Sequence, residues 1–278
     1  MALDLVRGAT DHYADAVYYD FTYRTRTEDI AFYQRVARQF GGPVLEIGGG
    51  SGRIATAIAK DGADVTALDA SRPMLKQGRA RARDELRKAD GHGEVTFVHG
   101  DMRSFDLGTK FPVVLAPFNT LLHLYEPADF AACFECVSRH MAKDGVFVFD
   151  VRMPNLRELN RDPTRVYRSR GFRHPTLGHR IEYTERFEYD ALKQVQHVTI
   201  RFEPGPGAPS GANAVETLLS QRQIFPNELR ALLALGGLRL AARHGDFTGR
   251  PLRGDDAQQV VTARSAAPEE RARARRAP

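Results

Sequence analysis

The sequence predicts an α/β fold: a doubly wound sheet of seven strands with a β-rich insert after the fifth strand. Two observations support this prediction. Up to residue 151, short apolar segments alternate with segments of helical periodicity that start and stop at capping signals. From residue 152 onwards, apolar residues recur with a period of two, which is typical of antiparallel strands. Alternating strands and helices favour parallel strands with helices on both faces of the sheet.

Each element of the first part follows from a local signal. Residues 11–40 have a helical pattern that is rich in aromatic side chains. The next expected helices begin at a proline or end at a glycine, and they cover residues 52–62, 73–89 and 127–145. The expected core strands are apolar runs bounded by turn residues, and they cover residues 43–47, 63–69, 94–101, 111–118 and 146–151.

The second part contains the insert and the end of the core. Period-two alternation on both sides of Asp190-Ala191-Leu192 predicts an antiparallel hairpin over residues 179–204, followed by a Gly- and Pro-rich loop. Further strands are expected over residues 216–225, 238–247 and 257–266, with a helix over residues 226–237. The expected domains are an N-terminal helical lid (1–42), a ligand-binding core (43–151), a β-rich substrate or dimer insert (152–223), the completion of the core sheet (224–264) and a disordered basic tail (265–278).

Composition restricts the class of protein. With 42% apolar and 27% charged residues, the chain is typical of a globular protein. It has no run of about 18 apolar residues and no secretory leader pattern at its start, so we expect a cytoplasmic protein without a membrane partner. Cys133 and Cys136 lie on an expected helix, where buried thiols are favoured over a redox pair. Because there is no second cysteine pair, we expect no metal site.

The positive charge is concentrated in two segments. Residues 264–278 hold five arginines and two glutamates, so much of the net charge of +5 lies in the expected tail and does not indicate a nucleic-acid surface. The segment from Arg157 to Arg180 has seven arginines but only Glu158 and Asp162 as acids. This cluster is either a solvated face or a wall that binds an anionic substrate.

The glycine-rich segment Gly48–Gly52 follows an expected strand and precedes an expected helix, which is the arrangement of a ligand-binding turn. A P-loop would require Lys and Ser or Thr after the last glycine, where this chain has Arg53 and Ile54. A dinucleotide loop would place its third glycine one residue later. A tight turn that binds nothing is the remaining alternative.

Five further residues agree with a cationic nucleoside as the ligand. Asp69 ends the second strand, where a carboxylate can accept hydrogen bonds from ribose hydroxyl groups. Asp101 ends the third strand and can accept from an adenine amino group, while Met74 and Met102 offer apolar contact to the ring. Glu46 precedes the loop, and an acidic side chain there favours a cationic ligand over a pyrophosphate.

Together these segments resemble the motifs of class I S-adenosylmethionine-dependent methyltransferases. The resemblance rests on "LEIGGGSGR", "VTALDAS", "FVHGDMRSFDL" and "FPVVLAPFNTLLHL", and it covers residues 11–151. "YDFTY" (Tyr19–Tyr23) is similar to the tyrosine-rich lid of small-molecule members, including sugar N-methyltransferases. One departure is visible, because such loops often read Cys-Gly-Thr-Gly where this chain has Gly49-Gly50-Ser51-Gly52. The resemblance implies a Rossmann-like fold and S-adenosylmethionine as the cofactor.

The resemblance also implies roles for individual residues. His123 and Tyr19 are the expected catalytic residues, His123 as a general base or as a group that orients the substrate. The expected cofactor-binding residues lie in the lid and at strand ends, and they are Tyr19, Tyr23, Glu46, Gly48, Gly50, Arg53, Asp69, Met74, Asp101, Met102, Pro117 and Asn119. Asp150 and Arg152 are weaker candidates for contact with substrate. Loop anchoring for His123, helix packing for the tyrosines and a surface position for Arg53 remain open alternatives.

The expected reaction is methyl transfer by in-line displacement to a small molecule, with an amine nitrogen as the favoured acceptor. The substrate is expected to be anionic if it meets the arginine cluster, and a homodimer through the insert is an expected assembly. The alternatives are an RNA or protein methyltransferase, a protein that senses the cofactor without chemistry, and a nicotinamide-dependent oxidoreductase. The sequence has no recognisable RNA-binding module, which disfavours a nucleic-acid partner.

Overall fold

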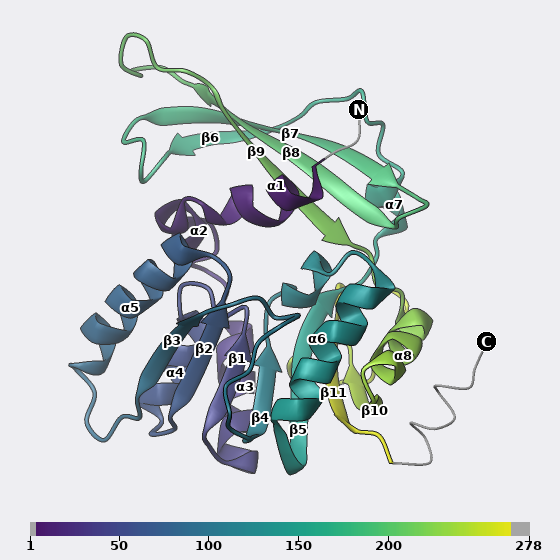
Figure 1. The fold of residues 1–278 in the computed structure, drawn as a ribbon. Coiled ribbons are helices and arrows are strands. Elements are labelled where there is room, and N and C mark those ends of the chain that lie inside the picture. The colour runs from purple at the N-terminus through teal and green to yellow at the C-terminus, as the bar shows by residue number, and fades with distance from the viewer. Residues whose placement is uncertain (1–3, 268–278) are drawn as a thin grey trace. The chain divides into compact units, whose positions relative to one another are not determined.

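The computed structural model describes residues 4–267, which divide into two compact units. The smaller unit contains the chain up to Thr25 together with Pro154–Gln223, and the larger unit contains Arg26–Met153 and the chain from Ile224 onwards. The expected lid over residues 1–42 is therefore divided between the two units. Figure 1 shows the sheet of each unit.

The larger unit is built on a seven-stranded sheet with the order β10-β11-β5-β4-β1-β2-β3. Its strands are β1 (Val44–Ile47), β2 (Val65–Asp69), β3 (Val95–His99), β4 (Phe111–Ala116), β5 (Met141–Arg152), β10 (Leu238–His244) and β11 (Gln258–Ser265). Strands β1 to β5 pair in parallel, whereas β11 is antiparallel to both β5 and β10. The sheet is therefore mixed, and the expectation of parallel strands holds for the first five.

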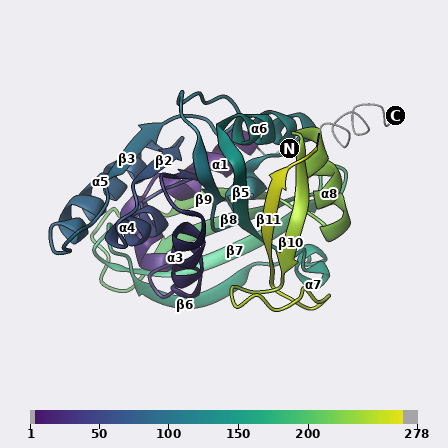
Figure 2. The same ribbon diagram turned by 90° about the horizontal axis from the view of Figure 1, so that it is seen from below.

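Helices cover both faces of this sheet, as a doubly wound fold requires (Figure 2). One core contains residues of α3 (Glu28–Phe40), α4 (Arg53–Lys60) and α5 (Arg72–Leu86). The other contains residues of α6 (Pro127–His140) and α8 (Pro226–Leu235). Strand β1 is buried along its whole length, which explains its continuous apolar pattern.

The largest differences from the expected boundaries concern two segments. The helix expected over residues 127–145 ends at His140, and residues from Met141 onwards already belong to β5. Gly145 was therefore a wrong stop signal, since it lies within the strand. The helical segment expected over residues 11–40 is broken into η1 (Asp11–Tyr13), α2 (Ala16–Thr22) and α3, and Asp15 caps α2 by accepting from the Tyr18 amide.

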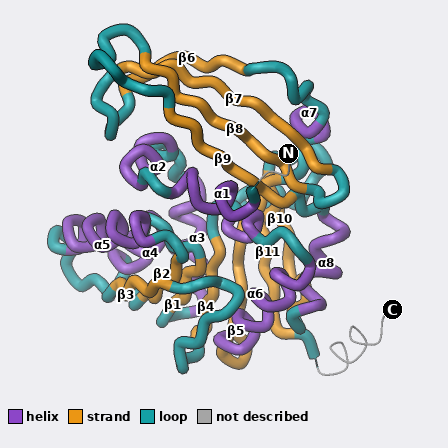
Figure 3. Tube along the Cα trace, turned by 45° about the horizontal axis from the view of Figure 1, so that its top comes forward, coloured by secondary structure: helices purple, strands orange, loops and turns teal. Residues whose placement is uncertain are grey.

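The smaller unit is a four-stranded antiparallel sheet with short helices (Figure 3). Its strands follow the order of the chain, and they are β6 (Tyr167–Arg173), β7 (Arg180–Asp190), β8 (Val195–Pro204) and β9 (Val215–Arg222). The predicted hairpin is confirmed as β7–β8. Strand β6 was not expected, because arginines obscure its alternation. The sheet is accompanied by α1 (Leu5–Thr10), α2 and α7 (Leu156–Leu159), and Tyr18 of α2 joins its apolar core.

Membrane-spanning helices and metal-binding clusters can be assessed only for the part of the chain that the structure describes. Within residues 4–267, no helix combines the length and apolar character that crossing a membrane requires. In the same range, no group of three or more His, Cys, Asp or Glu side chains could hold a metal ion. Most of the basic tail, from residue 268 onwards, lies outside the described residues.

Candidate functional site

The glycine-rich loop joins β1 to the first turn of α4 at the carboxyl edge of the sheet. Gly48, Gly50 and Gly52 have φ angles of +67°, +53° and +72°, which side-chain-bearing residues rarely adopt. A Cβ atom at Gly48 would also lie 2.4 Å from the side chain of Thr120 in the loop after β4. Glycine is therefore required there for both conformation and space, and the two loops are in close contact.

Asp69 is held in a defined orientation at the end of β2. Its Oδ2 accepts from the Gly50 amide at 2.8 Å, and its Oδ1 accepts from the Ser71 amide at 2.7 Å. Burial raises the pKa of this carboxyl, and the two amide bonds counteract that effect. Met74 is buried, and its methyl group would lie 3.2 Å from a Cβ at Gly50. The structure therefore places Asp69, Met74 and the glycine loop together, as the expected ribose and adenine contacts require.

Glu46 has a buried polar atom beside the glycine loop that no other group satisfies. Its side chain is buried on β1, and its Oε2 atom has no hydrogen-bond partner. Burial raises the pKa of Glu46 to about 8, although the charge of Arg53 counteracts the shift. The expected negative charge before the loop is therefore largely neutralised by a proton near pH 7. A cationic group beside Oε2 would restore the charge and satisfy the oxygen.

Asp101 is engaged differently from Asp69. The guanidinium of Arg103 approaches it with an Nη2–Oδ2 distance of 2.6 Å and also reaches Asp129 of α6 at 2.9 Å. This partner lowers the pKa of Asp101 despite partial burial. Met102 is half-buried and packs against the core. The expected role of Asp101 toward adenine stays a prediction, since any such contact must coexist with Arg103.

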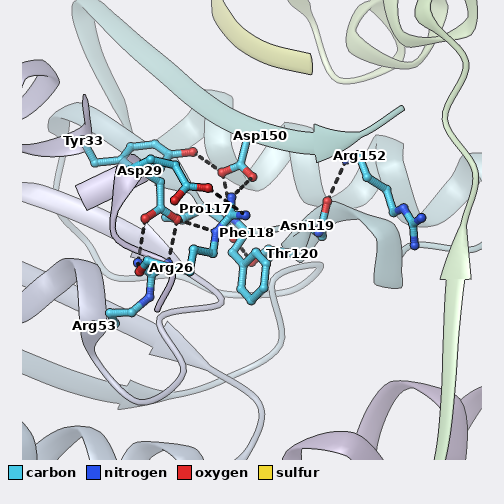
Figure 4. A network of polar contacts seen from close by, with 11 residues as sticks. Arg26, Asp29, Tyr33, Arg53, Pro117, Phe118, Asn119, Thr120, Asp150 and Arg152 are labelled. Carbon is cyan, nitrogen blue, oxygen red and sulfur yellow. Dashed lines mark hydrogen bonds and ion pairs between the residues drawn. The ribbon is translucent and has the colours of Figure 1, made fainter. Parts of the chain in front are cut away.

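The loop after β4 is tied to the end of β5 (Figure 4). Phe118 and Asn119 both have positive φ angles, +53° and +65°. The side chain of Asn119 accepts a hydrogen bond from the Arg152 amide at 2.7 Å, and Pro117 accepts one from Thr120 Oγ1 at 2.7 Å. Asn119 thus has a structural contact, and its expected role toward substrate or cofactor remains a prediction. His123 is half-buried at the end of η2 (Thr120–His123), which begins in this loop.

Sequence reasoning missed a buried ionic network beside this loop. Arg53 pairs with Asp29 through two contacts of 2.7 Å, and Arg26 bridges Asp29 and Asp150. Burial raises the pKa of Asp29, but the two arginines outweigh it and lower the pKa overall. The expected contact of Arg53 with a cofactor carboxylate remains a prediction, and any such contact would have to coexist with the Asp29 pair. The sequence offered only their spacing, because Asp29 and Tyr33 are four positions apart and so share one face of a helix.

The expected lid tyrosines belong to the smaller unit. Tyr23 lies 3.0 Å from His12 (Oη to Nε2), and the rings of Tyr19 and Tyr23 are 4.7 Å apart. His12 is buried, and this burial lowers its pKa to about 4, so it is neutral near pH 7. Tyr19 and Tyr23 are therefore part of an aromatic cluster within their own unit. Their expected contact with the cofactor stays a prediction.

Comparison with known proteins identifies the class. The methyltransferase domain family matches residues 44–145. A dTDP-3-amino-3,6-dideoxy-alpha-D-glucopyranose N,N-dimethyltransferase of Streptomyces fradiae is 26% identical over 220 residues, which make up 68% of this chain and 82% of that protein. The cypemycin N-terminal methyltransferase of a Streptomyces species is 33% identical over 114 residues, 41% of this chain and 43% of that protein.

Solved structures share the fold over most of the chain. The CcbJ methyltransferase of Streptomyces caelestis has a TM-score of 0.75 at 23% identity, and the match covers 95% of this chain and 100% of that one. S-adenosylmethionine-bound CalS10, an amino pentose methyltransferase of Micromonospora echinaspora, has a TM-score of 0.64 at 25% identity, with 88% and 95% covered.

The fold and the glycine-loop site therefore define a Rossmann-like, nucleoside-binding enzyme of the methyltransferase type. Residues 44–145 match a methyltransferase domain, the chain is an S-adenosylmethionine-dependent methyltransferase, and it is similar over most of its length to enzymes of this kind that act on amino sugars. The oxidoreductase and sensor alternatives are set aside by these matches.

Proposed function

We propose that this enzyme transfers a methyl group to the amine nitrogen of a small molecule, with a nucleotide-linked amino sugar as the first substrate class to test. The observation that supports this proposal most directly is the match over most of its length to a dTDP-amino-sugar N,N-dimethyltransferase. A second such enzyme, from Streptomyces venezuelae, is 25% identical over 232 residues and 89% of its length. A nucleotide-linked substrate would place the reaction in the cytoplasm.

The residues of the glycine loop region fit S-adenosylmethionine. Glu46 offers a buried oxygen without a partner to a cationic group, and Asp69 keeps lone pairs beside the loop for hydroxyl donors. We propose that these two, with Gly48, Gly50 and Met74, hold the cofactor, and that Asp101, Met102, Pro117, Asn119, Arg53, Tyr19 and Tyr23 complete its site. The bound cofactor supplies an electrophilic methyl group on sulfur.

The chain's own part in the reaction is to orient the acceptor and keep its nitrogen lone pair free. Holding the reacting atoms close and aligned accounts for much of the acceleration in such displacements. We propose that His123 orients the amine or accepts its proton, and that Tyr19 assists from the N-terminal segment. His123→Gln should then lower kcat by about 10²-fold, the lower end of general acid–base contributions, with cofactor affinity preserved.

The arginine cluster supports an anionic substrate. Six of its seven arginines are exposed, and Arg173 of β6 lies directly opposite Arg180 of β7. Like charges in that position are unfavourable unless an anion lies between them. We propose that this pair binds a phosphate or carboxylate of the substrate. Changing both residues to Gln should raise the KM for an anionic acceptor at least tenfold and leave the KM for a neutral amine unchanged.

The experiment that tests the proposal is incubation with methyl-labelled S-adenosylmethionine and a panel of acceptors. The panel contains dTDP-linked amino sugars, the matching hydroxy sugars, free amines, a peptide with a free N-terminus and RNA. Mass spectrometry should find the label on the amino sugars alone. Label on the peptide would favour the function named for the cypemycin enzyme, and label on RNA or on hydroxy sugars would contradict the proposal.

The oligomeric state of the protein is the subject of a separate proposal. We propose that the four-stranded sheet forms a homodimer, since its polar face carries both Arg and Glu side chains in alternating positions and is therefore self-complementary. Light scattering after size exclusion should give twice the chain mass. Charge reversal of Arg186 and Arg201 to Glu should yield monomers, and a monomeric wild type would contradict the proposal.

A further inference from the structure

Asp150 lies near the end of β5 and receives contacts from three separate parts of the larger unit. Its side chain is almost completely buried, at 1% exposure. Its Oδ1 accepts from the Tyr33 hydroxyl of α3 at 2.6 Å and from the Phe118 amide at 2.8 Å. Its Oδ2 lies 3.3 Å from Nη2 of Arg26. Figure 4 shows these three donors around the carboxylate.

The Phe118 contact matters because of the backbone there. Phe118 and Asn119 are consecutive residues with side chains, and both lie in the left-handed region. That conformation costs on the order of 1–2 kcal/mol for a residue such as phenylalanine, and it persists only where the surroundings hold it. The Asn119 amide donates to the main-chain oxygen of Asp150 at 3.1 Å. Both amides of the strained turn are thus bound by the same residue.

Arg26 reinforces the arrangement from the other side. Its guanidinium lies 4.3 Å from the centre of the Phe118 ring, so it contacts both the carboxylate and the strained residue. Burial raises the pKa of Asp150, while the Tyr33 hydroxyl, Arg26 and the Phe118 amide counteract this. The carboxylate is therefore surrounded by donors, which is the condition for keeping a buried charge.

The residue after this turn contacts the glycine loop. Thr120 follows the turn directly, and its side chain occupies the space that a Cβ at Gly48 would need. A change at Phe118–Asn119 would move Thr120 and remove the support of the glycine loop. The loop after β4 is thereby held against Gly48.

We propose that Asp150 is a positioning residue for the cofactor site, which holds Phe118 and Asn119 in the left-handed conformation and so supports the glycine loop. It acts on the glycine loop through the turn and Thr120. This inference concerns binding of the established cofactor and is independent of the identity of the methyl acceptor.

The test uses Asp150→Asn, which keeps the shape of the side chain but removes the charge facing Arg26. Titration calorimetry with S-adenosylhomocysteine should show about tenfold weaker binding. Hydrogen exchange of the Phe118 and Asn119 amides should become faster, while amides of β1 stay protected. In turnover, KM for S-adenosylmethionine should rise more than kcat falls.

A rescue experiment separates positioning from a general structural role. In the D150N background, adding Phe118→Gly should raise the affinity for S-adenosylhomocysteine at least threefold over that of D150N alone. The reason is that glycine adopts a positive φ without strain. Phe118→Ala removes the same ring but keeps a Cβ, so it should restore nothing. Equal affinities of the two double variants would overturn the proposal, as would wild-type affinity in folded D150N.

If D150N does not fold, Tyr33→Phe takes its place. This change removes one donor to Oδ1 and leaves the carboxylate and the aromatic packing. The same glycine and alanine comparison then applies, with a smaller initial loss of affinity. A Y33F variant with unchanged affinity and unchanged exchange at Phe118 would also contradict the proposal.

Discussion

Glu46 shows how burial changes the protonation of a carboxyl group that the sequence predicts to be charged. Its carboxyl has a pKa of about 8 against an ordinary 4.5, since it is buried. Because the folded form binds the proton more tightly, this group contributes stability below pH 4.5, and the contribution is lost as pH rises toward 8. Glu46→Gln should therefore flatten the decline of the unfolding free energy between pH 5 and 8, measured in urea.

The same carboxyl should respond to the cofactor. A cation beside Oε2 favours the ionised form, so binding of S-adenosylmethionine at pH 7 should release a proton from Glu46. Calorimetry in buffers of different ionisation enthalpy measures this release directly. We expect close to one proton for the wild type and none for Glu46→Gln. Equal release by both proteins would show that Glu46 does not sense the ligand's charge.

Gly48 is under two constraints, and a matched glycine separates them. Gly48 and Gly91 have nearly equal φ angles, +67° and +66°, but a Cβ at Gly91 would meet nothing within 4 Å. Gly91→Ala should cost about 1 kcal/mol of unfolding free energy, since only the backbone is strained. Gly48→Ala should cost about 1–3 kcal/mol more through overlap with Thr120. It should also weaken S-adenosylhomocysteine binding at least tenfold, whereas Gly91→Ala should leave binding unchanged.

At the level of elements, the Phe97 ring of β3 packs against both α5 and the glycine loop. A Cβ at Gly78 of α5 would lie 2.5 Å from the Phe97 ring of β3, and one at Gly52 would lie 2.9 Å from it. Two glycines thus create the space that Phe97 fills. The close approach explains why a residue of low helix propensity occurs within α5.

Gly78→Ala tests this packing against helix propensity. Propensity alone would stabilise α5 by about 1 kcal/mol, but overlap with Phe97 should reverse the sign and cost about 1–3 kcal/mol. Urea unfolding measures the net change. In a Phe97→Leu background the same substitution should cost much less, because the smaller side chain can move aside. A stabilising effect of Gly78→Ala in the wild-type background would show that the Phe97 ring can move aside at little energetic cost.

Some elements could be predicted because their signals are local. Strands β1 and β4 are apolar runs, and α5 has Pro73 in its first turn and a Ser71 cap. The end of α6 could not be predicted, since the choice between helix and strand at residues 141–145 depends on pairing with β4. Strand β6 was missed for a related reason, because the edge of a sheet tolerates arginines that hide its period.

At the scale of the whole molecule, the chain crosses three times between two compact units, each with its own core. A ligand that binds the larger unit should stabilise that unit first. At a hundredfold excess over its Kd, S-adenosylhomocysteine should add about 2.7 kcal/mol, which raises the midpoint of that unit by roughly 5–10 °C. Hydrogen exchange during heating should show the shift in β1 and β4 and a smaller shift in β7 and β8. Identical shifts would mean that both units unfold as one.

The sequence by itself determined the order of the core strands, the glycine loop, and the places of Glu46, Asp69 and Asp101 at strand ends, since periodicity, turn residues and motif spacing are properties of short segments. Only the tertiary structure decided which of these side chains are held by neighbours. Arg26 and Asp150 are 124 positions apart in the chain, and Tyr33 and Asp150 are 117 apart. No local pattern pairs such residues, because their proximity arises from the order of strands in the folded sheet. The strain at Phe118, the proton on Glu46 and the support of Gly48 by Thr120 all follow from that packing.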